Sequence, residues 1–342
     1  MANEVSAIRE TFNTFVKAWE KCDLQGLNKV ILPTCKVDYS IFKKDISVEE
    51  FKKELVTRTK KVTYSRFETY NFVCSHNKTK AAISAAIQGL FVNEEDKPTN
   101  FSFNGFITDS LVKTEDGWKF DNMRFILGSE SDNHARLKSN GISVDNMDGD
   151  VDFVKNWHLI DFNVGWHKDV RMISIVPEED CPWYAIKDRV NKETDEEQIK
   201  ECFFRYCYGL DCDCVELYDD VFSKTCNANY SGNRLYDKRS VTAMLRYERE
   251  GMIGMGHIMA FSSIDINGNI AKAHVYRAGY LPGGKLKGDL KYLNHVIARY
   301  DLVFIKEDDK WLIDDLRYYP GRLVVPFSKD TFISETDLKV TQ

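Results

Sequence analysis

The chain has 342 residues and a formal net charge of −6. This length is enough for two hydrophobic cores, since single domains usually run to roughly 100 to 200 residues. The negative charge speaks against a nucleic-acid surface, because binding to phosphates needs clustered Lys and Arg. No apolar stretch approaches the roughly 18 residues that would cross a bilayer. We therefore expect neither a nucleic-acid nor a membrane partner.

Nine cysteines occur in the chain, and its N-terminal segment is too polar for a signal peptide. Both observations favour a reducing, cytoplasmic environment over a disulfide framework. A group in the second half invites a zinc hypothesis: Cys202, Cys207, Cys212 and Cys214. Its spacing lacks the paired Cys-x-x-Cys loops that converge on one tetrahedral ion. We expect no metal and no cofactor.

The chain contains one pattern twice, in the same order and with the same spacing. Three segments carry the repeat in each half: Ile8–Phe12, Thr34–Ser40 and Asp116–Phe125 in the first, Ile199–Phe203, Thr225–Ser231 and Asp309–Tyr318 in the second. Each copy has the size of a domain and not of a short solenoid unit. The sequence therefore predicts a tandem duplication of one fold.

In the first copy, the predicted elements begin with a helix whose apolar stripe runs from Val5 to Trp19. A short helix, a strand and a third helix follow over Leu24–Val30, Cys35–Phe42 and Ser47–Leu55. Ser47 and Glu50 form a capping box at the start of the third helix. Long runs typical of strands complete the copy: Ser65–Cys74, Lys80–Val92, Asn100–Lys113 and Trp118–Leu127.

The second copy repeats this succession. Its predicted helices and first strand are Ile199–Leu210, Val215–Phe222 and Cys226–Ser231, and its later strands are His257–Ile266, Ile270–Leu281, Tyr292–Ile305 and Trp311–Tyr319. Helices that precede strands favour an α+β fold over an alternating one. Helices on a curved antiparallel sheet would form a cone with an open mouth, which is a natural pocket.

The expected domain boundaries follow from this pattern. The first domain covers 1–128, a connector covers 129–178, and the second domain covers 179–342. The connector carries Phe153, Trp157, Phe162 and Trp166, and a flexible linker would not contain that many aromatic residues. We expect it to be packed and partly helical.

Three stretches resemble a known superfamily. Leu27–Ser40 resembles the helix–strand junction of scytalone dehydratase, whereas Tyr206–Asp211 and Met255–His257 resemble bile acid 7α-dehydratase and the SnoaL-like enzymes. All belong to the NTF2-like, or cystatin-like cone, superfamily. The resemblance implies two NTF2-like cones, each with N-terminal helices on a curved antiparallel sheet. It also implies a homo-oligomer, or an internal pseudo-dimer formed by the fused copies.

The resemblance further implies roles for three residues. Tyr206 would polarise a substrate oxygen, Asp211 would support the site, and His257 would act as general acid or base. The dehydratase of bile acids has a further carboxylate near the position of Gly279, and this chain lacks it there. Candidate substrate-binding residues on the later strands are His274, Tyr276, Arg299 and Asp301.

The chemistry of these residue types agrees with such roles. A histidine titrates near neutrality, so it can take a proton from carbon and return it to a departing hydroxide. A phenol can donate a hydrogen bond to a carbonyl oxygen as that oxygen becomes enolate-like. Aligning the copies places Phe15, Glu20, Ser65 and Ala82 opposite Tyr206, Asp211, His257 and His274. The first copy is therefore expected to be a catalytically degenerate scaffold.

Each candidate also has a purely structural interpretation. Tyr206 could be a core residue, Asp211 could end its helix, and both histidines could be satisfied strand residues. The favoured function is a cofactor-free lyase, a dehydratase of a hydroxylated, carbonyl-bearing apolar ring such as a steroid, bile acid or polyketide. The alternatives are an isomerase or cyclase, and a non-catalytic module that binds small molecules or docks proteins.

Overall fold

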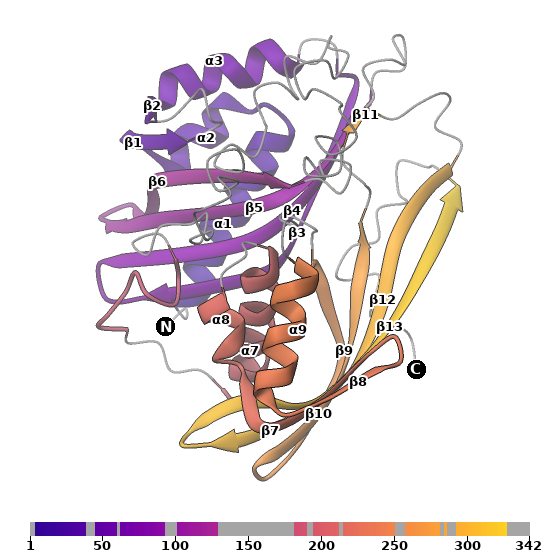
Figure 1. The fold of residues 1–342 in the computed structure, drawn as a ribbon. Helices are drawn as coiled ribbons and strands as arrows, with labels where there is room; N and C mark the ends of the chain where they lie inside the picture. Colours follow the sequence, from indigo (N-terminus) through magenta and orange to yellow (C-terminus); the bar gives the residue numbers. More distant parts are fainter. Residues whose placement is uncertain are drawn as a thin grey trace, which may run out of the picture. The chain divides into compact units, whose positions relative to one another are not determined.

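The computed structural model describes residues 4–38, 45–59, 62–92, 101–128, 181–189, 194–211, 215–249, 257–280, 284–285 and 292–326. These residues divide into two compact units (Figure 1). The expected connector over 129–178 lies outside the described residues. Residues 181–189 and 284–285 group with the first unit. One reason is the Asn77 side chain, which donates a hydrogen bond to the Asp188 carboxylate at 2.9 Å.

The first unit packs its helices on one sheet. The helices are α1 (Glu4–Glu20), α2 (Leu24–Val30) and α3 (Val48–Thr59). The strands are β1 (Ile31–Asp38), β2 (Ile46–Ser47), β3 (Tyr64–His76), β4 (Lys80–Val92), β5 (Phe101–Thr114) and β6 (Gly117–Gly128). Their order is β2-β1-β6-β5-β4-β3, and β11 (Gly284–Lys285) pairs with β5.

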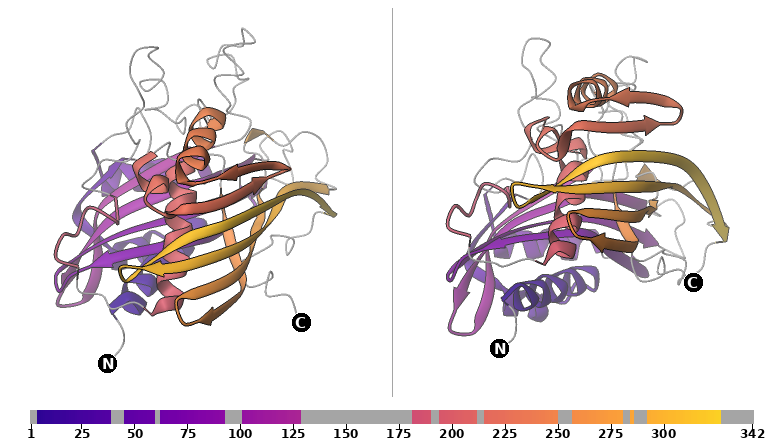
Figure 2. Two further views of the ribbon diagram at one scale, coloured as in Figure 1. Left: turned by 60° about the horizontal axis from the view of Figure 1, so that its bottom comes forward. Right: turned by 90° about the horizontal axis from the view of Figure 1, so that it is seen from below.

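The second unit repeats this arrangement. Its helices are α7 (Asp195–Asp211), α8 (Val215–Asp219) and α9 (Lys238–Arg249). Its strands are β7 (Phe222–Tyr230), β8 (Asn233–Tyr236), β9 (Met259–Asn267), β10 (Ile270–Tyr280), β12 (Tyr292–Glu307) and β13 (Lys310–Pro326). The order β8-β7-β13-β12-β10-β9 matches the first sheet position by position. Figure 2 shows that β12 and β13 bend along their length. The predicted α+β class, with helices on a curved sheet, is confirmed.

Both sheets are mixed and not purely antiparallel as expected. β1 runs parallel to β6, and β7 runs parallel to β13. No hairpin joins the strands of either pair, so chain connectivity does not impose an antiparallel direction on them. The remaining neighbours in both sheets are antiparallel.

The first helix of each unit is anchored in the same way. In α7, Asp195 accepts hydrogen bonds from the Lys306 ammonium at 2.7 Å and from the Trp311 indole at 2.9 Å. In α1, Glu4 accepts from Lys113 and Trp118. An acidic residue in the first turn also suits the positive end of the helix dipole. This shared contact fixes where each helix enters its cone.

None of the helices in the described part of the chain is long and apolar enough to cross a membrane. The apolar residues serve the cores instead. In α1, the stripe Ile8, Phe12, Phe15 and Trp19 is buried. In the second sheet, Ala271, Ala273 and Val275 of β10 are buried, while the alternating Lys272 and His274 are exposed. One face of the sheet therefore faces the helices and the other faces outward.

Candidate functional site

A buried histidine–carboxylate pair joins the end of α7 to the start of the strand segment that follows α9. The Asp211 carboxylate accepts two hydrogen bonds from His257, one from its backbone N–H at 2.7 Å and one from its ring Nδ1 at 2.6 Å. Neither side chain is more than 1% exposed. Because Asp211 holds the Nδ1 proton, the Nε2 atom of His257 carries the lone pair in the neutral ring. Such a ring is oriented as a general base.

The first unit contains half of this arrangement. Its helix-end carboxylate, that of Glu20, accepts a hydrogen bond from the backbone N–H of Phe67 at 2.6 Å. Because the matching bond in the second unit comes from the backbone N–H of His257, Phe67, and not Ser65 as expected, is the counterpart of His257. Ser65 instead donates its hydroxyl to the Glu20 backbone carbonyl. The carboxylate-to-backbone bond is therefore common to both units, and only the imidazole is particular to the second.

Tyr206 belongs to a second hydrogen-bonded pair on the same helix. Its side chain is 1% exposed, and its hydroxyl lies 3.0 Å from the Tyr230 hydroxyl on β7. Asp211 lies five residues later, which is about 140° further around an α-helix. Tyr206 and Asp211 therefore leave α7 in different directions. The structure brings Asp211 and His257 together, and it brings Tyr206 to Tyr230.

Three tyrosines form a row across neighbouring strands on the helix-facing side of the second sheet. Tyr230 pairs in register with Tyr318, and Tyr318 pairs with Tyr300. The rings of Tyr300 and Tyr318 lie 5.1 Å apart between centroids. Burial raises the pKa of Tyr300 well above its usual range, and the nearby Tyr206 adds to this. A phenol with a raised pKa stays protonated and remains a hydrogen-bond donor.

The sequence analysis missed Tyr230, Tyr300 and Tyr318. A signal was available at Tyr300 and Tyr318, because the equivalent positions in the first unit are apolar, whereas Tyr230 has a tyrosine, Tyr39, as its counterpart in the repeat. The register pair Tyr300–Tyr318 corresponds to Ile107–Phe125. At these positions the second unit has hydroxyl groups where the first unit has hydrocarbon. Burying a hydroxyl group costs free energy unless it forms a hydrogen bond, so these tyrosines are unexpected in a purely structural core.

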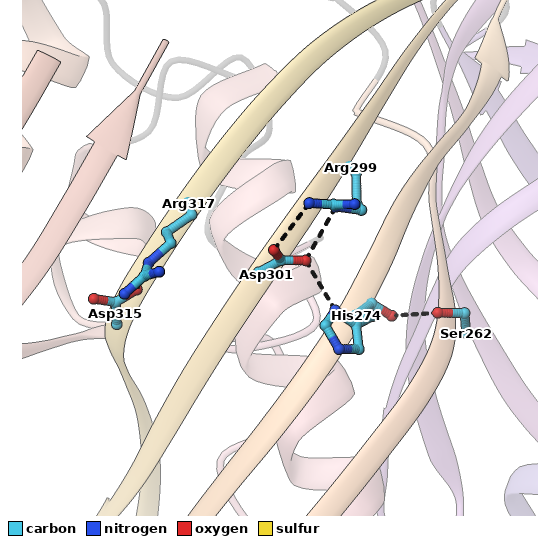
Figure 3. A network of polar contacts seen from close by, with 6 residues as sticks. All are labelled: Ser262, His274, Arg299, Asp301, Asp315 and Arg317. Atoms are coloured by element: carbon cyan, nitrogen blue, oxygen red, sulfur yellow. Dashed lines mark hydrogen bonds and ion pairs between the residues drawn. The ribbon is translucent and has the colours of Figure 1, made fainter. Parts of the chain in front are cut away.

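The four predicted substrate-binding residues lie on the outward face of the second sheet. Asp301 accepts from the His274 Nδ1 at 2.8 Å and from the Arg299 guanidinium at 3.2 Å (Figure 3). The His274 side chain is 56% exposed, and Tyr276 on the same face is half-buried. The inward orientation that His274 needed for a role beside His257 is not met, because its strand neighbours Ala273 and Val275 take the inward positions.

The position of the missing family carboxylate, Gly279, lies near the end of β10. Arg277 precedes it by two residues and is 4% exposed on the helix-facing side. The Arg277 charge acts on the nearby Tyr300 by lowering its pKa, against the larger effect of burial. A buried cation therefore lies beside the tyrosine row, at the inner face of the cone.

The cysteines of the described segments form no metal site. Within those segments, no three His, Cys, Asp or Glu side chains are grouped as ion ligands would be. Cys212 and Cys214 lie outside the described residues. Burial raises the pKa of Cys202 and of Cys226 to about 12 in each case. Both thiols are therefore protonated near neutral pH.

This pKa shift predicts a labelling pattern. At pH 8, only about one in 10⁴ of such thiols is ionised, and the thiolate is the reactive form. Iodoacetamide at pH 8 should therefore label the half-buried Cys22 and leave Cys202 and Cys226 unmodified until urea unfolds the chain. Site-resolved mass spectrometry measures this. Equal rates at Cys22 and Cys202 in the native protein would contradict the burial described.

The comparisons with known proteins bear on the second unit. Residues 192–317 match the SnoaL-like domain family. No curated protein matches the chain. Among solved structures, a candidate scytalone dehydratase from Novosphingobium aromaticivorans is 17% identical, with 36% of this chain and 84% of that one covered and a TM-score of 0.34.

Two further solved structures are similar at the same level. A domain of unknown function with a cystatin-like fold from Nostoc punctiforme is 18% identical, over 38% of this chain and 80% of that one, with a TM-score of 0.30. A candidate ketosteroid isomerase from Shewanella frigidimarina is 12% identical, over 35% and 94%, with a TM-score of 0.28. The C-terminal part of the chain, which holds Asp211 and His257, thus contains a SnoaL-like domain.

Proposed function

We propose that the second unit is a cofactor-free lyase that removes water from a hydroxylated, carbonyl-bearing apolar ring. The single observation that supports this most is the buried Asp211–His257 pair inside the SnoaL-like region. A carboxylate that fixes Nδ1–H leaves Nε2 as the base, and burial excludes the water that would compete for it. Steroids, bile acids and polyketide rings are the substrate classes of this kind.

The reaction would proceed by proton transfer from carbon. Nε2 of His257 takes the proton α to the carbonyl, the electron pair of that C–H bond forms a double bond to the carbonyl carbon, and the carbonyl π pair moves onto oxygen to give an enolate. The imidazolium, stabilised by Asp211, then gives its proton to the β-hydroxyl as the C–O bond breaks. Water and an unsaturated carbonyl compound leave, and the histidine returns to its neutral form.

The tyrosines would stabilise the enolate. Tyr206 and Tyr230 share a hydrogen bond of 3.0 Å, in which one hydroxyl donates and the other accepts. A carbonyl oxygen that gains negative charge is a stronger acceptor than a neutral phenol. Tyr300, protonated because its pKa is raised, extends the same donor surface.

The first unit would serve as a scaffold. Its position for the base is occupied by Phe67, and its position for the phenol by Phe15, neither of which can exchange a proton. We infer that the two units arose by duplication of an NTF2-like domain, with domains over 1–128 and 179–342 and a connector over 129–178. Loss of proton chemistry in one copy is consistent with an internal pseudo-dimer that keeps one active site.

A minimal substrate tests the proposal. The full chain is incubated with 3-hydroxy-1-tetralone, whose dehydration and tautomerisation give fluorescent 1-naphthol. Accelerated formation of naphthol supports a dehydratase. In parallel, 1-tetralone in D₂O reports exchange of the α-protons by NMR. Exchange without dehydration would favour the isomerase or cyclase alternative, and neither reaction with either ketone would favour a binding module.

A further inference from the structure

A pocket of about 350 Å³ lies on the outward face of the second sheet, opposite to the helices. It spans the strands β8, β7 and β13. Its lining residues are Asn227, Ala228, Asn229, Arg234, Leu235, Tyr236, Asp315, Arg317 and Tyr319. The size falls within the range of small-molecule sites, which is roughly 300 to 1,000 Å³. The proposed dehydratase uses none of these residues.

The side chains that line the pocket carry two positive charges and one negative charge. Arg317 donates from Nε to the Asp315 carboxylate at 3.0 Å, so these two charges offset each other. Arg234, on β8, has no hydrogen bond or ion pair with the residues that the structure describes. The Asn227 side-chain amide lies on β7, two residues before Asn229, the register partner of Arg234, and it is likewise unpaired among those residues. A guanidinium and an amide on neighbouring strands are suitable donors to an anion.

The equivalent positions in the first unit carry a different arrangement of charges. There, Asp38 of β1 and Arg124 of β6 are register partners and form an ion pair at 3.2 Å. In the second unit, the register partner of Arg317 is Asn229, which is neutral. The acid has moved to Asp315, on the strand of Arg317 itself. The space across the strands is thereby left open, and Arg234, register partner of Asn229, lies at its far side.

Two aromatic rings also line the pocket. Tyr236 is 63% exposed and Tyr319 is 42% exposed, and both line the pocket. The Arg299 guanidinium lies 4.5 Å from the centre of the Tyr319 ring. Asp301 holds Arg299 in place, as Figure 3 shows. The Tyr319 side chain is already ordered by this contact, so it loses little conformational entropy when a planar ligand stacks on it.

We propose that this pocket binds a small aromatic carboxylate. The carboxylate pairs with Arg234 and the Asn227 amide, and the ring lies against Tyr236 and Tyr319. Asp315 disfavours ligands with several negative charges, because it already neutralises Arg317 and would repel a second anion. The site thus selects for one negative charge joined to a flat apolar body.

The test uses 2-naphthoate and the full chain in isothermal titration calorimetry. The wild type should bind 2-naphthoate, and the neutral 2-naphthamide should bind about tenfold more weakly, since it loses the charge-assisted bond. Arg234→Gln should weaken 2-naphthoate by about tenfold and leave 2-naphthamide unchanged. Asp315→Asn should tighten 2-naphthoate, because Arg317 then becomes available.

Two matched variants make the result specific. Lys224→Gln removes an exposed charge from the same strand as Asn227 without touching the pocket, and it should not change the binding. His257→Asn changes a buried residue that does not line the pocket, and it should not change the binding either. The proposal is overturned if 2-naphthoate does not bind, or if it binds equally well to Arg234→Gln.

Discussion

Replacing His257 by Asn should abolish proton abstraction while the fold persists. The Asn amide N–H can take the place of Nδ1–H and donate to Asp211, and the backbone N–H keeps its own bond to that carboxylate. No group then stands at the position of Nε2. Loss of a positioned general base costs on the order of 10² to 10⁴ in rate. Naphthol formation from 3-hydroxy-1-tetralone measures the loss, and circular dichroism with thermal unfolding measures the fold.

His274→Asn is the matched control. It makes the same change at a histidine on β10, and Asn can likewise donate to Asp301 in place of Nδ1. Since His274 faces outward, dehydration should continue at the rate of the wild type. A loss of activity in this control, or full activity in His257→Asn, would show that the base has been assigned to the wrong residue.

Removing the Asp211 carboxylate should strongly destabilise the second unit. Asp211→Ala leaves the His257 backbone N–H and ring N–H without their acceptor in a fully buried position. Breaking a buried, hydrogen-bonded pair by deleting one partner costs about 3 to 5 kcal/mol. Urea unfolding should show this as a lower midpoint for the second unit, and calorimetry as a separate early transition.

Asp211→Asn separates stability from chemistry. An amide oxygen can accept from the His257 backbone, and its NH₂ can donate to Nδ1, so the fold should persist. The ring proton then moves to Nε2, and the base is lost through the wrong tautomer, at a cost on the order of 10³ to 10⁴ in rate. Glu20→Gln in the first unit makes the corresponding change at a carboxylate with no imidazole partner. Unchanged turnover in Asp211→Asn would rule out the proposed role of the pair.

Much of the fold could be predicted from periodicity because the elements are long and their turns are marked. β4 was predicted with its observed bounds, Lys80–Val92. β1 begins at Ile31, earlier than predicted. Its first residues include Pro33, which lies in a stretch where the register with β6 shifts. A proline is tolerated at such an irregularity, although it weakens the sequence signal for a strand.

The site was only partly predictable, because strand parity decides which side chains share a face. Asp211 and His257 stood out by residue type and by contrast with the first copy. His274 was ambiguous until its neighbours Ala273 and Val275 were seen to be buried. The tyrosine row could not be found by motif, since Tyr300 and Tyr318 meet only through the pairing of β12 with β13. Register between distant segments is what a single sequence leaves open.

The bond between a helix-end carboxylate and a strand N–H has a consequence for how such a site can originate. In the first unit it already holds a half-buried acid, Glu20, against the backbone of Phe67. An ancestor of this kind would need no new acid and no new backbone geometry to acquire a base. A single substitution of His for Phe at that position would place an imidazole next to the carboxylate, which would orient it as a proton acceptor. On the proposed mechanism, the base is therefore one substitution away from a contact that both units contain.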